Sequence, residues 1–302
     1  MATPRDARRE QPHTYVVENR SDEEELRRLQ VHDRMFTSRM GGVLPEQADP
    51  GEFRRVLDVG CGTGGWLIEA AKTYPHMSLL IGVDASRMMV EYARAQAEAQ
   101  GVSERVEFHV MDALRFLEFP NDFFDLVNQR AGMSWLRTWD WGKLLQEYIR
   151  VAGPGGIIRV TEGDVIPDST SPALTRVGEL GVAAFYQSGH LFTAEKGGVR
   201  KELASLLSRH SIEQVQTRAY ALEYRAGTEQ WQDLFDDMKH GMRTGLPFLR
   251  KWTQVPDNYE EIYQQALNEM QQADFVATWH VVTAWGRVPP DKERIDFFSS
   301  PR

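Results

Sequence analysis

The 302-residue chain has one cysteine, no apolar run long enough to cross a bilayer and no block of basic residues. The single cysteine, Cys61, cannot form an internal disulfide and excludes a multi-cysteine metal site, which indicates a reducing compartment. A membrane-spanning helix needs about 20 apolar residues in succession. The segment from Met1 to Gln11 is polar and charged rather than signal-like. We therefore expect a cytoplasmic protein that makes no membrane contact.

The chain is acidic, with 35 Lys and Arg residues against 44 Asp and Glu residues and a formal net charge of −9. Because such a surface is repelled by phosphate backbones, we expect no nucleic-acid partner. No cluster of His, Asp and Glu has ligand spacing, so we expect no metal site. Hydrophobic residues make up 41% of the chain, enough for one large domain with its own core. Both a monomer and a homodimer are compatible with this composition.

Short apolar segments alternate with helical stretches from residue 54 onward. The apolar segments are residues 55–59, 79–84, 106–110, 124–128 and 157–161. Strands that alternate with helices of about 10–15 residues predict parallel βαβ units in a doubly wound sheet. Right-handed crossovers then place the loops after the strands on one rim of the sheet, where ligands bind.

This alternation lapses in the second half of the chain. Residues of about 164–200 and 226–274 have the apolar spacing of helices. Two long alternating segments, 213–224 and 275–288, predict a pair of antiparallel strands. The two helical regions are therefore predicted to be insertions that form a lid on the sheet.

The start of the chain differs from the rest. A charged helix is predicted over residues of about 22–36, followed by a linker rich in glycine and proline. We therefore predict two parts, an N-terminal helical arm over residues 1–50 that contributes to the lid and a core over residues 51–302 that carries the insertions.

The most specific feature is the segment Asp58-Val59-Gly60-Cys61-Gly62-Thr63-Gly64-Gly65, which joins the first strand to a helix. Glycines at such a turn let the backbone bend tightly and approach a ligand closely. Asp84 ends the next strand, twenty residues after Gly64, where its carboxylate can accept both hydroxyls of an adenosine ribose. The first, second and fourth glycines of the segment also satisfy the dinucleotide fingerprint G-x-G-x-x-G, so a nicotinamide-dependent oxidoreductase remains an alternative.

Two further acids favour a different ligand. Asp58 precedes the first glycine by two residues, a position suited to the amino-acid end of a ligand. Asp112, followed by Ala113, ends the third strand, where an adenine amino group would lie. With these motifs, residues 54–164 resemble the class I S-adenosylmethionine (SAM)-dependent methyltransferases in order and in spacing. The resemblance implies a Rossmann-like, seven-stranded, doubly wound α/β sheet with helical lid insertions.

The resemblance also implies a cofactor site for SAM, with S-adenosylhomocysteine (SAH) as the product. The backbone of the glycine turn would line the methionine and the ribose, and Asn128 with Gln129 would form a floor beneath the sulfonium. Tyr15 would fold over the cofactor with the first helix. The complete set of implied cofactor-binding residues is Tyr15, Gly60, Cys61, Gly62, Gly64, Asp84, Ala85, Met89, Asp112, Ala113, Asn128 and Gln129.

The acceptor side carries weaker signals. Methyl transfer needs mainly positioning, and it needs a base only where the acceptor carries a proton of high pKa. His190 and Tyr186 in the first insertion and Arg130 after the fourth strand are the candidates for a substrate pocket. His32 and His240 are weaker candidates, and no catalytic residue is assigned. The aromatic residues of the insertions are compatible both with a pocket for a medium-sized organic molecule and with a plain lid core.

These observations predict a SAM-dependent methyltransferase that acts on a small, natural-product-like organic molecule. Two alternatives keep the same fold, because fold does not fix function. One is a SAM-binding enzyme of non-methylating chemistry, such as a cyclase, and the other is a non-catalytic SAM-binding domain. The acceptor atom stays open at this point.

Overall fold

The structure, a computed structural model, describes Tyr15 and residues 23–290 of the chain. Its centre is one mixed sheet whose strands run in the order β3-β2-β1-β4-β5-β8, with β7 on the other edge of β8. The strands are β1 (Arg55–Val59), β2 (Leu79–Asp84), β3 (Val106–Val110), β4 (Phe124–Arg130), β5 (Ala152–Gly163), β6 (Asp168–Ser169), β7 (Glu213–Arg225) and β8 (Val276–Arg287). Strands β1 to β5 are parallel, whereas β8 is antiparallel to both β5 and β7.

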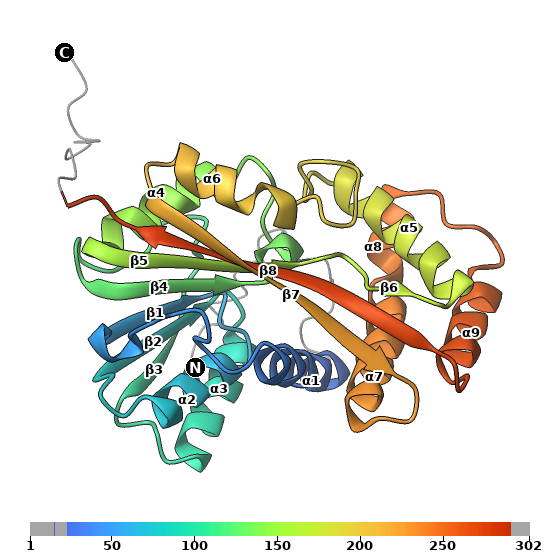
Figure 1. The fold of residues 1–302 in the computed structure, drawn as a ribbon, viewed down its shortest axis with the longest axis horizontal. Coiled ribbons are helices and arrows are strands. Elements are labelled where there is room, and N and C mark those ends of the chain that lie inside the picture. Colours follow the sequence, from blue (N-terminus) through green and yellow to red (C-terminus); the bar gives the residue numbers. More distant parts are fainter. Residues whose placement is uncertain (1–14, 16–22, 291–302) are drawn as a thin grey trace, which may run out of the picture.

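The parallel strands are short apolar segments because helices cover both faces of the sheet. In β1, Val56 and Leu57 are fully buried and belong to the cores on opposite faces. The covering helices are α2 (Gly65–Thr73) and α3 (Arg87–Ala99) on one face and α4 (Trp141–Val151) and α6 (Leu203–Arg209) on the other. Figure 1 shows the two pairs below and above the sheet. The predicted doubly wound arrangement is confirmed.

Strand β6 is the strand of the described chain that the sequence does not predict. Asp168 and Ser169 pair with Thr278 and Ala277 on the same edge of β8 that β5 occupies further along. The predicted seven strands are thus present, and β6 adds an eighth to the sheet. A two-residue strand is too short to show the alternation by which strands are predicted.

A second hydrophobic core lies beyond the carboxyl ends of the parallel strands. It is formed by helices from the two predicted insertions, by the outer part of the β7–β8 pair and by Met35, Phe36 and Met40. The helices are α5 (Pro172–Gln187), α7 (Glu229–Thr244), α8 (Leu246–Trp252) and α9 (Tyr259–Met270), and we refer to these four as the lid. In Figure 1, β7 and β8 run from the parallel strands out to the lid.

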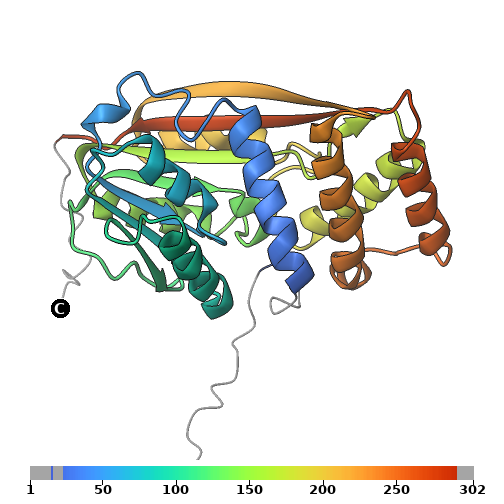
Figure 2. The ribbon, with the colours of Figure 1, turned by 90° about the horizontal axis from the view of Figure 1, so that it is seen from below.

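Helix α1 (Glu23–Arg39) lies between the core and the lid. It packs against α2 on one side and α7 on the other, as Figure 2 shows. The predicted helix over residues 22–36 is confirmed and continues to Arg39. The division into an arm over residues 1–50 and a core over residues 51–302 stays a prediction. No helix in the part of the chain that the structure describes is long and apolar enough to cross a bilayer.

Candidate functional site

The glycine turn between β1 and α2 has a backbone that only glycine adopts without strain. The φ angles of Gly60, Gly62 and Gly64 are 69°, 51° and 77°, in the left-handed region. A Cβ atom on Gly64 would also lie 2.6 Å from the ring of Phe108. The first two backbone N–H groups of the turn donate to the Val83 carbonyl at 2.9 and 3.0 Å. The turn is therefore tied to β2 and offers backbone rather than bulky side chains to a ligand.

Two acids stand at the ends of the next two strands, as the sequence predicts. Asp84 at the end of β2 accepts hydrogen bonds from the backbone N–H groups of Gly62 at 3.1 Å and Ser86 at 2.8 Å. Asp112, beyond the end of β3, is exposed and accepts a backbone N–H from its own loop at 3.0 Å. These bonds hold Asp84 beside the glycine turn and fix the Asp112 carboxylate within its own loop.

Asp58 lies under the turn at the end of a buried polar chain. Asn128 Nδ2 donates to Asp58 Oδ1 at 2.7 Å, and Arg159 Nη1 donates to Asn128 Oδ1, also at 2.7 Å. Arg159 Nε in turn donates to Glu46 at 2.7 Å. Burial raises the pKa of Asp58 to about 6. Although burial opposes it, the Arg159 guanidinium lowers the pKa of the Glu46 carboxyl.

Gln129, the next residue of β4, belongs to the opposite face of the sheet. Its Oε1 accepts the Tyr148 hydroxyl at 2.8 Å, and its Nε2 donates to Glu162 at 3.3 Å. Glu162 also accepts the backbone N–H groups of Gly132 at 2.6 Å and Met133 at 3.3 Å. Burial raises the pKa of Glu162 to about 8, so this carboxyl holds a proton at neutral pH. Gln129 and Glu162 therefore fix the turn that follows β4.

A cavity of about 330 Å³ joins the glycine turn to the lid. At the turn it is lined by Asp58, Gly60 and Gly62, and in the lid its walls are mainly apolar. The apolar lining of the lid end includes Val177, Phe185, Met238, Met242, Phe248, Leu249, Trp279 and Val281. The predicted cofactor turn and the predicted lid thus enclose one continuous space.

The predicted site residues divide into two groups around this cavity. Those that line it are Tyr15, Gly60, Cys61, Gly62 and Arg130. Those that do not line it are Gly64, Asp84, Ala85, Met89, Asp112, Ala113, Asn128, Gln129, His190 and Tyr186. Asn128 still acts on the cavity through the Asp58 carboxyl that it holds. Burial raises the pKa of the Cys61 thiol well above its usual value, which agrees with a turn residue rather than a nucleophile.

Arg130 at the end of β4 connects the sheet to α1. Its Nη1 donates to Thr37 Oγ1 at 3.1 Å, and its Nη2 pairs with the Asp33 carboxylate. Asp33 lies over the glycine turn, since a Cβ atom on Gly65 would collide with its carboxylate. Arg130 Nε is buried and has no hydrogen-bond partner among the described residues. Buried donors of this kind are normally satisfied, and this nitrogen, which has almost no surface open to the cavity, is an exception.

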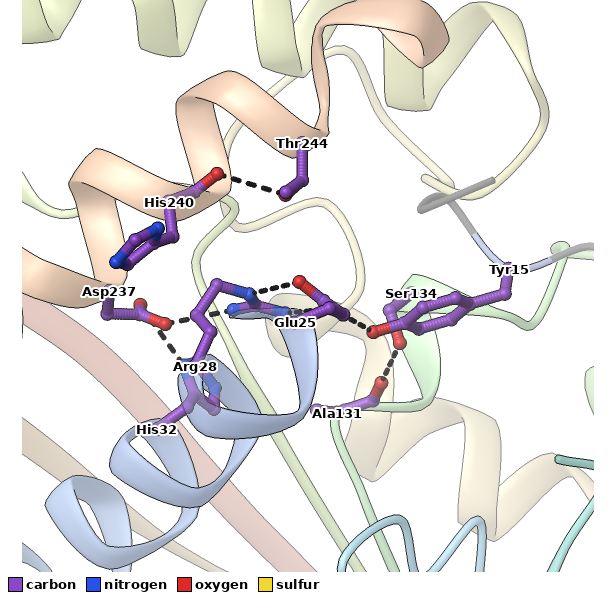
Figure 3. Close-up of polar contacts among 9 residues, drawn as sticks. All are labelled: Tyr15, Glu25, Arg28, His32, Ala131, Ser134, Asp237, His240 and Thr244. Atoms are coloured by element: carbon purple, nitrogen blue, oxygen red, sulfur yellow. Dashed lines mark hydrogen bonds and ion pairs between the residues drawn. The ribbon is translucent and has the colours of Figure 1, made fainter. Parts of the chain in front are cut away.

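A cluster of charged side chains joins α1 to α7 along the cavity wall, as Figure 3 shows. Arg28 donates through Nε and Nη2 to Glu25, both at 2.8 Å, and through Nη1 to Asp237 at 2.9 Å. His32 Nδ1 lies 3.2 Å from the second oxygen of Asp237, and the Tyr15 hydroxyl donates to Glu25 at 2.9 Å. Because Glu25 and Asp237 are buried, each carboxylate depends on these partners.

Sequence reasoning does not find this cluster. Arg28 and His32 are four residues apart, which places them on the same face of α1, but this spacing is common on charged helices. Their shared partner, Asp237, lies 205 residues beyond His32. Only the packing of α1 against α7 brings the three together.

His190 and Tyr186 lie elsewhere in the first insertion. His190 is buried, with Nδ1 donating to the Met133 carbonyl at 2.9 Å and with the rings of Phe185 and Phe248 against it. Burial lowers the pKa of His190, which keeps the imidazole neutral. Tyr186 is 47% exposed on the outside of α5. His190 therefore packs the lid, and Tyr186 belongs to its surface.

Known proteins match the chain most strongly in its core. Residues 56–156 match the methyltransferase domain family. Ajmaline N-methyltransferase of Rauvolfia serpentina is 38% identical over 35% of this chain and 34% of its own length. The 27-O-demethylrifamycin SV methyltransferase of Amycolatopsis mediterranei is 27% identical over 84% of this chain and 78% of its own. Phosphoethanolamine N-methyltransferase 2 of Haemonchus contortus, solved with SAH, has a TM-score of 0.51 at 18% identity and covers 87% of this chain and 57% of its own.

The fold and the site define a Rossmann-like α/β protein with a ligand site at the carboxyl ends of its parallel strands. Residues 56–156 are a methyltransferase domain of the class I SAM-dependent type, as the matched family, the sheet order and the glycine turn show. The matched segment spans about a third of the length of the first curated relatives. The part shared with these first relatives is therefore the core, whereas the rifamycin methyltransferase aligns over 84% of this chain.

Proposed function

We propose that this protein is a SAM-dependent methyltransferase that acts on a small, largely apolar organic molecule. The observation that carries the proposal is the single cavity between the glycine turn and the apolar lid. Methyl transfer requires the methyl donor and the acceptor atom to be held in line in one shared space. The ajmaline and rifamycin methyltransferases among the relatives are named for natural products, which supports an acceptor of that kind.

The residues at the turn fit SAM, which supplies a methyl group activated by the sulfonium. The glycine backbone leaves room for the methionine part, and Asp58 suits its ammonium group. The guanidinium of Arg130, which lines the cavity, suits its carboxylate. Asp84 and Asp112, which do not line the cavity, would accept the ribose hydroxyls and contact the adenine edge.

Calorimetric titration with SAM, SAH and NADH tests the cofactor class. We expect micromolar binding of SAM and SAH and no binding of NADH. Binding of NADH alone would mean that the glycine turn serves a dinucleotide. Release of SAH in a screen of hydroxylated aromatic and polyketide-like compounds then tests methyl transfer, whereas turnover without SAM consumption would identify a non-methylating enzyme.

Asp84→Ala tests the ribose contact. Loss of a charged acceptor that binds ribose hydroxyls is expected to weaken SAH binding at least tenfold, on the order of 1.5–3 kcal/mol for each hydrogen bond. The matched control is Glu91→Ala, which removes an exposed carboxylate from α3. Equal SAH affinities in the two variants would contradict the assignment of Asp84.

A further inference from the structure

We propose that His32, oriented by Asp237, is the base that takes the proton from a hydroxyl group of the acceptor. The inference rests on the proposed methyl transfer and adds the acceptor's chemical class, a hydroxyl compound with an apolar body. Three features carry it: the place of His32 in the cavity, the carboxylate behind its ring and the apolar surfaces beside it.

Helix α1 places His32 between the two ends of the cavity. Asp33, the next residue, lies over the glycine turn and pairs with Arg130. His32 itself lines the cavity toward the lid, and its side chain is 25% exposed. Among the described residues, His32 is the only histidine in the cavity lining. An acceptor bound at the lid end of the cavity would therefore contact the imidazole of His32 where the cavity continues to the glycine turn.

The Asp237 carboxylate fixes the proton on the ring of His32. A carboxylate only accepts, so its contact with Nδ1 at 3.2 Å requires the proton on Nδ1 and leaves the lone pair on Nε2. Among Tyr15 and residues 23–290, no group is hydrogen-bonded to Nε2. Although burial opposes it, His32 and Arg28 lower the pKa of Asp237, so the carboxylate stays ionised to stabilise an imidazolium.

The surroundings of His32 suit an apolar body more than a charged one. The ring centroid of His32 lies 4.4 Å from that of Phe36 and 5.7 Å from that of Trp279, and both aromatic residues line the cavity. The titratable and charged groups near His32 are Arg28 and Asp33 on α1, Asp237 and His240 on α7, and Asp164 after β5. Arg28, Asp33 and Asp164 are held in ion pairs of their own, which leaves the imidazole of His32 as the group offered to the acceptor.

The proposed step balances without a further reactant. The acceptor's O–H bond breaks and its proton moves to Nε2 of His32, while the oxygen forms a bond to the methyl carbon. The electron pair of the broken C–S bond remains on sulfur, and SAH is left. The imidazolium then returns its proton to water. Asp237 is a positioning residue in this step, since it acts through the imidazole.

The test uses 4-nitrophenol, whose ionised form is read directly from its absorbance, bound to the SAH-saturated protein. We expect bound nitrophenol to ionise at a lower pH than free nitrophenol, with its ionisation constant raised at least about tenfold. In His32→Gln the probe still binds, but it ionises no more readily than free nitrophenol, because an apolar site favours the neutral phenol. Asp237→Asn is expected to abolish the effect as well, since an amide donor toward Nδ1 would move the imidazole proton to Nε2.

The matched control is His109→Gln. His109 also pairs with a carboxylate, Glu107 at 3.1 Å, but lies on β3 outside the cavity, so this variant should match the wild-type protein. Wild-type ionisation of bound probe in His32→Gln, or no binding of nitrophenol by the wild-type protein, would overturn the proposal. Calorimetry with SAH on the same proteins separates this result from the proposed function. Absence of SAH binding would defeat methyl transfer, whereas SAH binding without a shift in the ionisation of nitrophenol would defeat only the role of His32.

Discussion

A single buried carboxyl, Glu162, makes the stability of the protein depend on pH. Its pKa is about 8 in the folded chain, against 4.5 for an ordinary glutamate. Between these values the folded state holds a proton that the unfolded state has released. The contribution of Glu162 to the free energy of unfolding is therefore greatest below about pH 4.5. It falls as the pH rises toward 8, with a slope on the order of 1 kcal/mol per pH unit.

Glu162→Gln removes this titration. We expect the free energy of unfolding of the wild-type protein to fall between pH 6.5 and 8 relative to the variant, by on the order of 1 kcal/mol per pH unit. Urea unfolding at several pH values measures the difference. Glu98→Gln, which changes an exposed glutamate, serves as the control. Parallel pH profiles for wild type and Glu162→Gln would show that the buried carboxyl does not hold its proton.

The glycines of the turn differ in what a side chain would meet. At Gly64 a methyl group would combine left-handed strain with contact to the Phe108 ring, whereas at Gly62 nothing lies within 4 Å of the added atom. We expect Gly64→Ala to cost about 2–4 kcal/mol of stability and Gly62→Ala only about 1–2 kcal/mol. Chemical unfolding measures the free energy of unfolding of the two variants. Equal losses would mean that the Phe108 ring moves aside for the added methyl group at little cost.

At the scale of elements, α1 is held to α7 by ion pairs of unequal burial. Arg28 pairs with Asp237, which is 1% exposed, while Arg34 pairs with Asp233 nearer the surface. Removal of the Asp237 charge leaves Arg28 with Glu25 alone and takes the carboxylate partner from His32, whereas an exposed ion pair contributes little. The attachment of α1 to the lid therefore depends mainly on one aspartate.

Asp237→Asn and Asp233→Asn form a matched pair on the same helix. We expect the first to lower the free energy of unfolding by about 3–5 kcal/mol and the second by less than about 1 kcal/mol. Thermal or urea unfolding gives both values. A small loss in Asp237→Asn would indicate that Arg28 and His32 find other partners.

The sequence predicts those elements whose signals are local. The strand–helix alternation, the glycine turn and the late strand pair each lie within one continuous segment, and all are found in the structure. Asn128 and Gln129 show where this reasoning stops, because neighbours on a strand face opposite sides and only one of the two reaches toward Asp58. The cluster formed by Arg28, His32 and Asp237 depends on the packing of two helices that are far apart in the sequence. No local sequence pattern predicts such packing.

At the scale of the whole molecule, strand β8 connects two hydrophobic cores. Trp279 and Val281 of β8 belong to the core of the lid, whereas Ala284, later in the strand, and Val288, just beyond its end, belong to the core under α4 and α6. Its partner β7 runs beside it along most of its length. Unfolding of the lid would therefore expose part of the strand that supports the sheet.

We accordingly expect a single cooperative unfolding transition in differential scanning calorimetry. SAH should move the whole transition upward, because a ligand at 100 times its Kd stabilises the folded state by about 2.7 kcal/mol. Two separate transitions, or a shift confined to part of the heat absorption, would show that the lid and the core unfold independently.

The β7–β8 pair also suggests how proteins with this fold can acquire new acceptors during evolution. Helices α7, α8 and α9 leave the sheet after Arg225 and return at Val276, and these two residues are paired neighbours. Recombination at this one junction could graft a foreign segment onto the core and give it a new acceptor range while the SAM half is inherited unchanged. A graft that lacks a counterpart of Asp237 would lose its buried ion pair with α1, so inheritance of the module is constrained chiefly by that carboxylate.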